Sequence, residues 1–248
     1  MEEERRIING IPYVRTFFDN FEGDELDPEK WEKCPEVKRQ AFARWDDSCT
    51  RLDGKGHLIL ITKYVEGDER LHCGAVRTRK KDNSRDLFNQ SFGYFEIRLK
   101  IHTKPGFWSA FWLMPDVIEK GEDGLAGNEI DIFETFDALG HKLNHAVHWD
   151  GYKENHKHID IGVERNVYDG EYHTFALDWS KDAYIFYIDG EESARINADE
   201  TDISDYPNYI KISLESSHWS GMAKKEDLPD GVVVDYVKVY QREEYLEN

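Results

Sequence analysis

Apolar and polar residues alternate along much of this chain in short runs, which is the pattern of half-buried β-strands. Turn sequences such as Asp189-Gly190 separate the runs. No long segment repeats its apolar positions with the helical period of about 3.6, so we expect little helix. The strands that this pattern predicts cover residues 57–62, 93–101, 172–179, 184–188 and 232–240.

Short strands at this spacing indicate an all-β fold, and we predict a jelly-roll sandwich of two antiparallel sheets. The chain has 248 residues and shows no internal repeat, low-complexity tract or linker. We therefore predict a single domain over residues 1–248, in which residues 1–15 form an N-terminal extension. Residues 116–127 are predicted to form a mobile loop at a cleft rim, just before the next strand.

The strand after this loop carries three acids, in the run Glu129-Ile-Asp-Ile-Phe-Glu134. Alternate side chains of a strand share a face, so Glu129 and Asp131 project together while the isoleucines enter the core. Glu134 joins them only if the strand contains one extra residue, a β-bulge. Acids gathered on one face repel one another and add nothing to a core, so we expect them to serve chemistry.

Glycoside hydrolysis is the chemistry that needs such a set. A retaining enzyme uses one ionised carboxylate as nucleophile and one protonated carboxyl as general acid, about 5–5.5 Å apart. The long side chains of Glu129 and Glu134 can lean toward each other, and the shorter Asp131 can hydrogen-bond the nucleophile. Neighbouring charge helps to keep one member protonated near neutral pH. The alternative is a solvated strand face in an acidic protein.

The overall charge restricts the partners. The chain has 32 Lys and Arg residues against 51 Asp and Glu residues, a formal net charge of −19. This argues against nucleic acid and anionic membranes as partners, and more weakly against a heavily sulfated polysaccharide. A neutral polysaccharide is compatible with it, and so is a charge that serves only solubility. We expect a monomer.

The cysteines and the N-terminus say little about the compartment. Cys34, Cys49 and Cys73 have no metal-binding spacing, and we expect three thiols rather than a disulfide. No apolar stretch approaches the length of a membrane span, and residues 1–6 lack the apolar region of a signal peptide. The protein is either cytoplasmic, or extracellular with a signal segment that this sequence does not include, and both remain open.

Several sequence motifs occur along the chain in the order that is typical of one enzyme family. Residues 106–115 read Gly-Phe-Trp-Ser-Ala-Phe-Trp-Leu-Met-Pro, and Glu129, Asp131 and Glu134 form a Glu-x-Asp-x-x-Glu motif. The first run is similar to Gly-x-Trp-Pro-Ala-Phe-Trp, and the second to a bulged acid motif, both typical of glycoside hydrolase family 16. With segments 17–21, 172–179, 187–190 and 234–241, the chain resembles this family of jelly-roll β-glucanases and β-galactanases nearly from end to end.

The resemblance implies an enzyme that cleaves inside polysaccharides with retention of configuration, in an open cleft on the concave sheet. It implies that Glu129 is the nucleophile and forms a covalent glycosyl ester. Glu134 would protonate the leaving oxygen and then deprotonate the incoming water. Asp131 would assist by hydrogen-bonding the nucleophile. No cofactor is expected for catalysis.

Aromatic rings are natural contacts for the C–H faces of sugars. The resemblance places Trp108 and Trp219 at the cleft. Trp112 shares a face with Trp108 because the two are four residues apart in a predicted strand. Arg77 matches a family arginine that hydrogen-bonds substrate hydroxyls, with a surface ion pair as the alternative. Core packing is the alternative for all three tryptophans.

Four histidines need separate interpretations. His145 and His148 lie in the strand predicted beside the acids, three residues apart, so they face opposite ways. The resemblance makes His148 the inward one, near Glu134, with a structural histidine as the alternative. His156 and His158 look like a metal patch, but the sequence shows no third ligand, and we favour a solvated turn.

The resemblance also implies a structural Ca²⁺ ion far from the chemistry, bound by oxygen ligands. The matching positions are the carboxylate of Asp235 and the backbone carbonyls of Asn20 and Gly56. Asp235 interrupts the apolar run 232–237 and needs a partner if it is buried. A hydrogen bond or an arginine is the alternative to calcium.

Two departures weaken the assignment of one polysaccharide. Ser109 stands where many members have Pro, and residues 126–128 replace the Trp-Pro-containing run of typical laminarin-cleaving enzymes. We predict an endo-hydrolase of β-1,3 or mixed β-1,3/1,4 glucan. The alternatives are an endo-β-galactosidase or galactanase, transglycosylation, and a non-catalytic carbohydrate-binding relative, which we would expect to have lost one glutamate.

Overall fold

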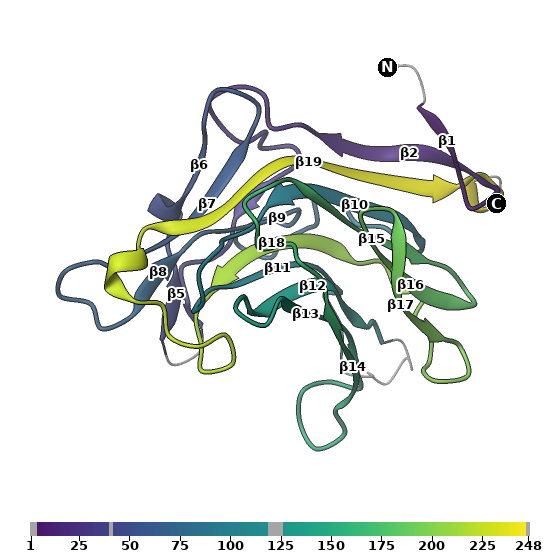
Figure 1. Ribbon diagram of the computed structural model, residues 1–248. Coiled ribbons are helices and arrows are strands. Elements are labelled where there is room, and N and C mark those ends of the chain that lie inside the picture. Colours follow the sequence, from purple (N-terminus) through teal and green to yellow (C-terminus); the bar gives the residue numbers. More distant parts are fainter. Residues whose placement is uncertain (1–3, 40–41, 119–125, 247–248) are drawn as a thin grey trace.

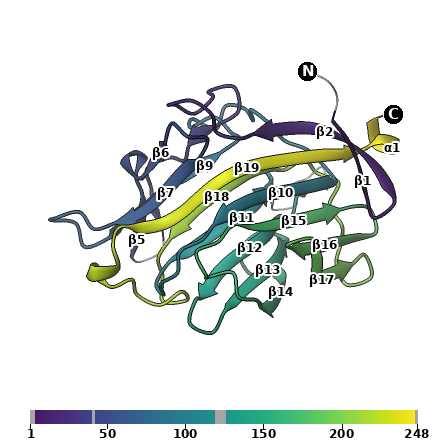
Figure 2. The ribbon, with the colours of Figure 1, turned by 45° about the horizontal axis from the view of Figure 1, so that its top comes forward.

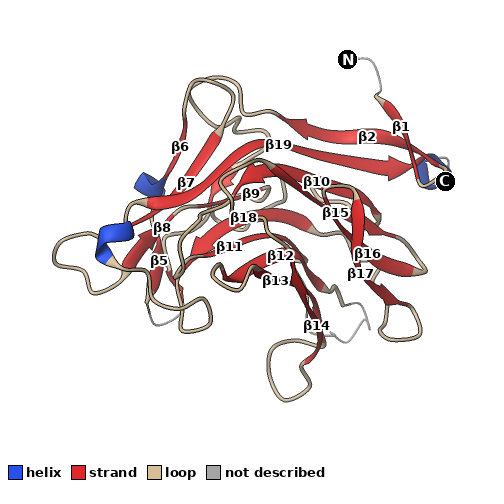
Figure 3. Cartoon of the chain, in the orientation of Figure 1, coloured by secondary structure: helices blue, strands red, loops and turns tan. Residues whose placement is uncertain are grey.

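The computed structural model describes residues 4–39, 42–118 and 126–246. Within these ranges the chain is almost entirely β-structure, as Figure 3 shows. Helix is confined there to α1 (Glu243–Leu246) and two 3₁₀ turns at Asp47–Cys49 and Lys225–Asp227, as the lack of helical period predicted. The loop predicted at residues 116–127 lies mostly outside the described residues.

The strands form two sheets that pack face to face as a jelly-roll sandwich (Figure 1). The larger sheet has 12 strands in the described chain, antiparallel except for one pair. Nine of them follow the spatial order β17 (Glu191–Asn197), β16 (Ala183–Ile188), β15 (His173–Trp179), β10 (Gly93–Lys100), β19 (Asp230–Arg242), β7 (Leu58–Lys63), β8 (Leu71–Cys73), β5 (Ala43–Trp45) and β4 (Lys38–Arg39). Beside this path lie β1 (Arg5–Ile8), β2 (Ile11–Asp19) and β6 (Thr50–Leu52).

The smaller sheet has 7 strands in the described residues and carries the acid motif on its third strand. All five strands predicted from the alternation lie in the larger sheet and are confirmed within a residue or two of their ends. The order of the smaller sheet is β14 (Lys157–Glu164), β13 (Lys142–Trp149), β12 (Glu129–Asp137), β11 (Trp108–Met114), β18 (Tyr209–Glu215), β9 (Ala75–Arg77) and β3 (Glu32–Lys33).

The inner faces of the two sheets enclose one large apolar core. Phe133 of β12 and Phe175 of β15 meet across it with ring centroids 4.2 Å apart, and both are fully buried. Cys34, Cys49 and Cys73 are buried free thiols, as predicted. In most strands alternate side chains therefore pack into the core, which leaves the other face of the smaller sheet available for a binding surface.

The N-terminal segment is part of the larger sheet. Residues 5–15, which we predicted to extend from the domain, form β1 and the start of β2, and β2 pairs with β19. Strand β1 and helix α1 lie at the same end of the molecule (Figure 2).

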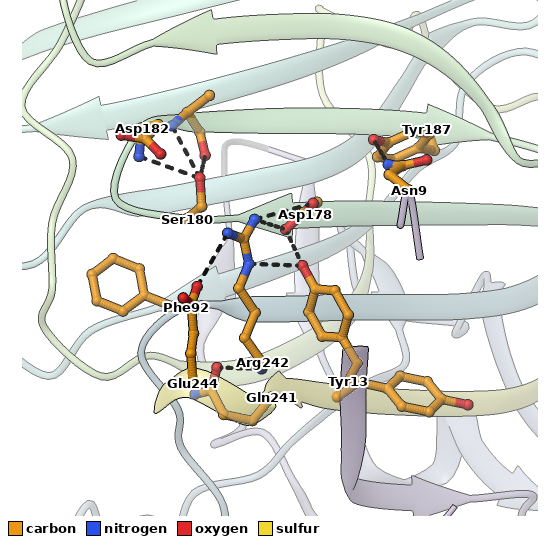
Figure 4. Close-up of polar contacts among 12 residues, drawn as sticks. Asn9, Tyr13, Phe92, Asp178, Ser180, Asp182, Tyr187, Gln241, Arg242 and Glu244 are labelled. Atoms are coloured by element: carbon orange, nitrogen blue, oxygen red, sulfur yellow. Dashed lines mark hydrogen bonds and ion pairs between the residues drawn. The ribbon is translucent and has the colours of Figure 1, made fainter. Parts of the chain in front are cut away.

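A buried polar cluster joins three strands of the larger sheet at this end (Figure 4). Tyr13 of β2 donates a hydrogen bond of 2.7 Å to the Asp178 carboxylate of β15. Arg242, the last residue of β19, donates to the Tyr13 hydroxyl at 2.9 Å and pairs with Asp178 at 3.2 Å. The cluster thus ties the first and last long strands to the middle of the sheet.

Candidate active site

One face of the smaller sheet lines a cavity of about 860 Å³. The lining residues recur at every second position, as the pleat of a strand requires. They include residues 108, 110, 112 and 114 of β11 and residues 211, 213 and 215 of β18. The residues between them, such as Phe111 and Ile212, belong to the core on the other side of the sheet.

Strand β12 breaks this period once. Its lining residues are 129, 131, 134 and 136. Asp131 pairs with Ala146 of β13, and Glu134 pairs with Asn144. Between these two pairs β12 advances by three residues and β13 by only two. The two apolar residues between the acids, at 132 and 133, both enter the core. The register confirms the predicted β-bulge, which puts all three carboxylates on one wall of the cavity.

Glu134 is buried and held by two hydrogen-bond donors. Trp108 donates its indole N–H to Oε1 at 3.0 Å, and Asn144 donates its amide to Oε2 at 3.3 Å. Burial raises the pKa of Glu134 well above its ordinary value, and the nearby Asp131 carboxylate raises it further. A carboxyl group that keeps its proton in this way is suited to act as a general acid.

Asp131 is buried between the two glutamates, and its Oδ2 atom has no hydrogen-bond partner among the described residues. Burial and the charge of Glu129 raise the pKa of Asp131 well above its ordinary range. The Nε2 atom of His148 lies 3.4 Å from that Oδ2 atom. Glu129 is only half-buried, and the Tyr152 hydroxyl donates a hydrogen bond to its Oε2 atom. The three acids therefore occupy three different environments.

The three predicted tryptophans all line the cavity. Trp219 is 43% exposed, stacks on Phe136 with centroids 4.9 Å apart, and meets the edge of Trp108 at 5.1 Å. Trp112 is buried, and the Lys211 ammonium lies 3.6 Å from its ring centroid. Trp219 and Trp108 therefore form the more accessible aromatic wall, while Trp112 has one ring face covered by a cation.

Arg77 is not among the residues that line the cavity. It is buried in β9, where its guanidinium donates to the Lys80 carbonyl at 2.5 Å. Its contact with substrate stays a prediction. His145 is buried and faces the core, where its Nδ1 atom lies 2.6 Å from the Ile132 carbonyl, and burial lowers its pKa to about 4. His148 faces the cavity, so the two histidines point in opposite directions.

The histidine patch has a third member that the sequence did not show. Strand register places His148 directly opposite His158, and His156 lies in the turn just before β14. One ring nitrogen from each of His148, His156 and His158 lies within 4.8 Å of the other two. The interpretation of His156 and His158 as only a solvated turn therefore left out a residue from the neighbouring strand.

The residues predicted to bind calcium come together in a separate hollow of about 520 Å³. Asn20, Gly56 and Asp235 all line it. The donors are oxygens, which fits Ca²⁺, but Arg98 also pairs with one oxygen of Asp235. The alternative of an arginine partner for Asp235 is therefore realised in the structure, beside an otherwise suitable set of donors.

The polar residues of the cavity that were not predicted include Asn144, Tyr152, Lys211 and Glu215. Asn144 shares a strand face with His148, and Lys211 shares one with Glu215, so the period of two could have revealed these three. Tyr152 lies in the turn after β13, where no periodicity applies.

Comparison with known proteins assigns the family. The model of "Glycosyl hydrolases family 16" matches residues 56–238. The chain therefore belongs to glycoside hydrolase family 16, as its motifs predicted.

Relatives of this chain are named for different activities. The endo-1,3-1,4-beta-glycanase ExsH of Rhizobium meliloti is 29% identical over 62% of this chain and 31% of its own length. The keratan-sulfate endo-1,4-beta-galactosidase of Sphingobacterium multivorum is 26% identical over 95% of the chain and 58% of its own length. The beta-glucanase of Rhodothermus marinus is 26% identical over 87% of the chain and 80% of its own length. The chain thus spans less than two thirds of the first two relatives.

The fold has close counterparts among solved structures. The laminarinase from Rhodothermus marinus superposes with a TM-score of 0.77 at 21% identity, covering 98% of this chain and 99% of that chain. Within the described ranges, no helix has the length and hydropathy of a membrane span.

Proposed function

We propose that this chain is a retaining, endo-acting glycoside hydrolase that cleaves β-1,3 or mixed β-1,3/1,4 glucan. The observation that carries the proposal is the bulge in β12, which brings Glu129 and Glu134 to one cavity wall. Their surroundings differ as the reaction requires. Glu129 is half-buried and accepts a hydrogen bond from Tyr152, while Glu134 is buried with a raised pKa.

The two glutamates would act in two successive displacements. Glu129 attacks the anomeric carbon while the protonated Glu134 donates its proton to the leaving glycosidic oxygen. The resulting glycosyl ester on Glu129 is then hydrolysed by water, from which Glu134, now ionised, removes a proton. Asp131 lies between them and would assist the nucleophile, and Trp108 orients Glu134 through its indole N–H bond.

A glucan substrate is supported by the glucanases among the relatives and by the accessible wall of Trp108 and Trp219. A galactan substrate is the second candidate, because one relative of nearly full chain coverage is named as a galactosidase. Transglycosylation shares the same ester and differs only in the acceptor. A purely binding role is disfavoured because binding alone requires neither the two glutamates nor the raised pKa of Glu134.

We also propose a structural Ca²⁺ ion in the hollow of Asn20, Gly56 and Asp235. The support is the convergence of these three positions on one hollow and the oxygen character of their donors. The ion would compete with Arg98 for the Asp235 carboxylate.

The test of the activity is a substrate panel with product sizing. We expect release of reducing ends from laminarin, lichenan or barley glucan, with oligosaccharides rather than single sugars as first products. Activity on agarose or galactan alone would transfer the proposal to the second candidate. Glu129→Ala and Glu134→Ala should each lower kcat by at least about 10²-fold, whereas the exposed Glu192→Ala should not. Full activity of either active-site variant would refute the assignment.

A further inference from the structure

Three histidines, of which His148 lines the cavity, form a cluster that the reaction proposed above does not use. His148 projects from β13 and lines the cavity, His158 lies opposite it on β14, and His156 precedes β14. The Nδ1 atom of His148 is 3.0 Å from the Nε2 atom of His156. The three ring planes are nearly parallel, within 16–24° of one another.

The chemistry of this cluster fits a borderline transition metal. Neutral imidazole nitrogens bind Zn²⁺ well, and three of them leave a fourth position open for water or another ligand. Ca²⁺ and Mg²⁺ prefer oxygen ligands, so nitrogen donors select against them. One ring nitrogen of each lies within 4.8 Å of the other two. Because the lone pairs lie in the ring planes, the nearly parallel rings must turn about their side-chain torsions to bring each nitrogen to about 2.0–2.1 Å from one ion.

Carboxylates stand behind two of the three rings. The Oδ2 atom of Asp131 is 3.4 Å from the Nε2 atom of His148, and Asp160 contacts the Nε2 atom of His158 at 3.1 Å. Histidine ligands of metals usually donate their second N–H to a carboxylate in this way, which fixes the ring and strengthens binding. The unpartnered Oδ2 atom of Asp131 is buried, so a bound and oriented His148 would also satisfy it.

We propose that His148, His156 and His158 bind a Zn²⁺ ion at the wall of the cavity. The side chain of His158 is 50% exposed, so the ion can enter from solvent. The pairing of β13 with β14 sets the relative positions of two ligands before the metal arrives.

Zn²⁺ bound at this position should inhibit hydrolysis, a consequence that rests on the proposed function. The ion would fix the ring of His148, the member of the cluster that lines the cavity and lies next to Asp131. It would also hold the turn that carries both His156 and Tyr152, whose hydroxyl bonds Glu129.

Binding is measured directly by calorimetry with ZnCl₂ on the metal-free chain in the presence of Ca²⁺. We expect one Zn²⁺ per chain, with affinity lowered at least about tenfold in His156→Gln and in His158→Gln. The matched control is His173→Gln, because His173 also contacts two carboxylates, Asp169 and Asp189, but lies outside the cluster. Circular dichroism of each variant establishes that it is folded.

Co²⁺ serves as a spectroscopic probe of the same site. Imidazole ligands in a four-coordinate site intensify its visible absorption, and Zn²⁺ should abolish that absorption by displacement. An unchanged Zn²⁺ affinity in both folded ligand variants, or an equal loss in His173→Gln, would overturn the site.

The activity measurement separates this proposal from the proposed function. If Zn²⁺ inhibits the parent chain and inhibits His156→Gln at least about tenfold less strongly, the site and its consequence both stand. If no polysaccharide is cleaved, the proposed function fails, while calorimetry and Co²⁺ absorption still decide the metal site.

Discussion

Glu134 is an ionisable residue whose side chain is buried, where the charged form of a carboxyl group is unfavourable. Its carboxyl group is buried, and the burial and the neighbouring Asp131 raise its pKa. The unfolded chain releases this proton at its ordinary pKa of about 4.3. Between that pH and the folded-state pKa, the folded chain binds more protons than the unfolded chain, so stability falls as pH rises.

Replacing Glu134 by Gln should therefore stabilise the fold at neutral pH. The amide cannot ionise, and each kcal/mol gained raises Tm by about 2–4 °C in a chain of this size. The gain should disappear below about pH 4, where both chains are neutral at this position. Thermal unfolding at several pH values measures the difference in Tm.

Glu192→Gln is the matched control for this measurement. The Arg195 hydrogen bond lowers the pKa of Glu192, so its replacement should bring no gain in Tm at neutral pH. A Tm of Glu134→Gln that equals or falls below that of the parent chain at neutral pH would contradict the burial argument.

At the residue scale, the sequence showed the acids but not their surroundings. Glu129, Asp131 and Glu134 could be recognised because chemistry and strand period are both local. Tyr152 reaches Glu129 from a turn, whose conformation has no period to read. His148 and His158 meet because of a cross-strand register that depends on tertiary structure.

At the scale of elements, the bulge of β12 decides the site. A strand of regular period would turn Glu134 into the core, and one extra residue returns it to the cavity. The bulge was predictable because an acid that faced the core would be unfavourable, so all three acids within these six residues should share the face away from the core. The strand pattern around Arg77 did not indicate which face its side chain takes. The structure places Arg77 outside the residues that line the cavity.

The cluster that joins β2, β15 and β19 should contribute strongly to stability. Asp178→Ala would remove the buried carboxylate partner of Arg242, since the two side chains are only 3% and 11% exposed. The guanidinium would keep its longer carboxylate contact, of 3.7 Å with the exposed Glu244. We expect a loss of about 3–5 kcal/mol in the free energy of unfolding. Tyr13→Phe removes one hydroxyl and should cost about 1 kcal/mol. Urea unfolding measures both, and a loss for Asp178→Ala no larger than that for Tyr13→Phe would refute the role of the ion pair.

At the scale of the whole molecule, the candidate active site and the predicted calcium site involve different sheets. The smaller sheet presents the acids and tryptophans, while the hollow predicted to hold calcium involves Asp235 of β19 in the larger sheet. The jelly-roll sandwich was predictable from strand spacing, but the pairing of Asp235 with Arg98 requires knowledge of neighbouring strands.

Calcium should therefore change stability through the larger sheet. At a hundredfold excess over Kd, a bound ion adds about 2.7 kcal/mol, or roughly 5–10 °C in Tm. We expect a chelator to remove this gain and Asp235→Asn to abolish the Ca²⁺-dependent shift. An equal shift in Asp235→Asn, or no shift in the parent chain, would place the ion elsewhere or exclude it.

In the proposed mechanism the bulge of β12 places the acid Glu134 on the same cavity wall as the nucleophile Glu129. An activated 2-deoxy-2-fluoro glycoside of a β-glucan oligosaccharide slows the second step of a retaining enzyme and traps its ester. Mass spectrometry of the intact chain and of its peptides should find one glycosyl group, attached to Glu129 and absent from Glu129→Gln. An adduct on any other residue, or turnover of glucan with inverted products and no adduct, would contradict the account.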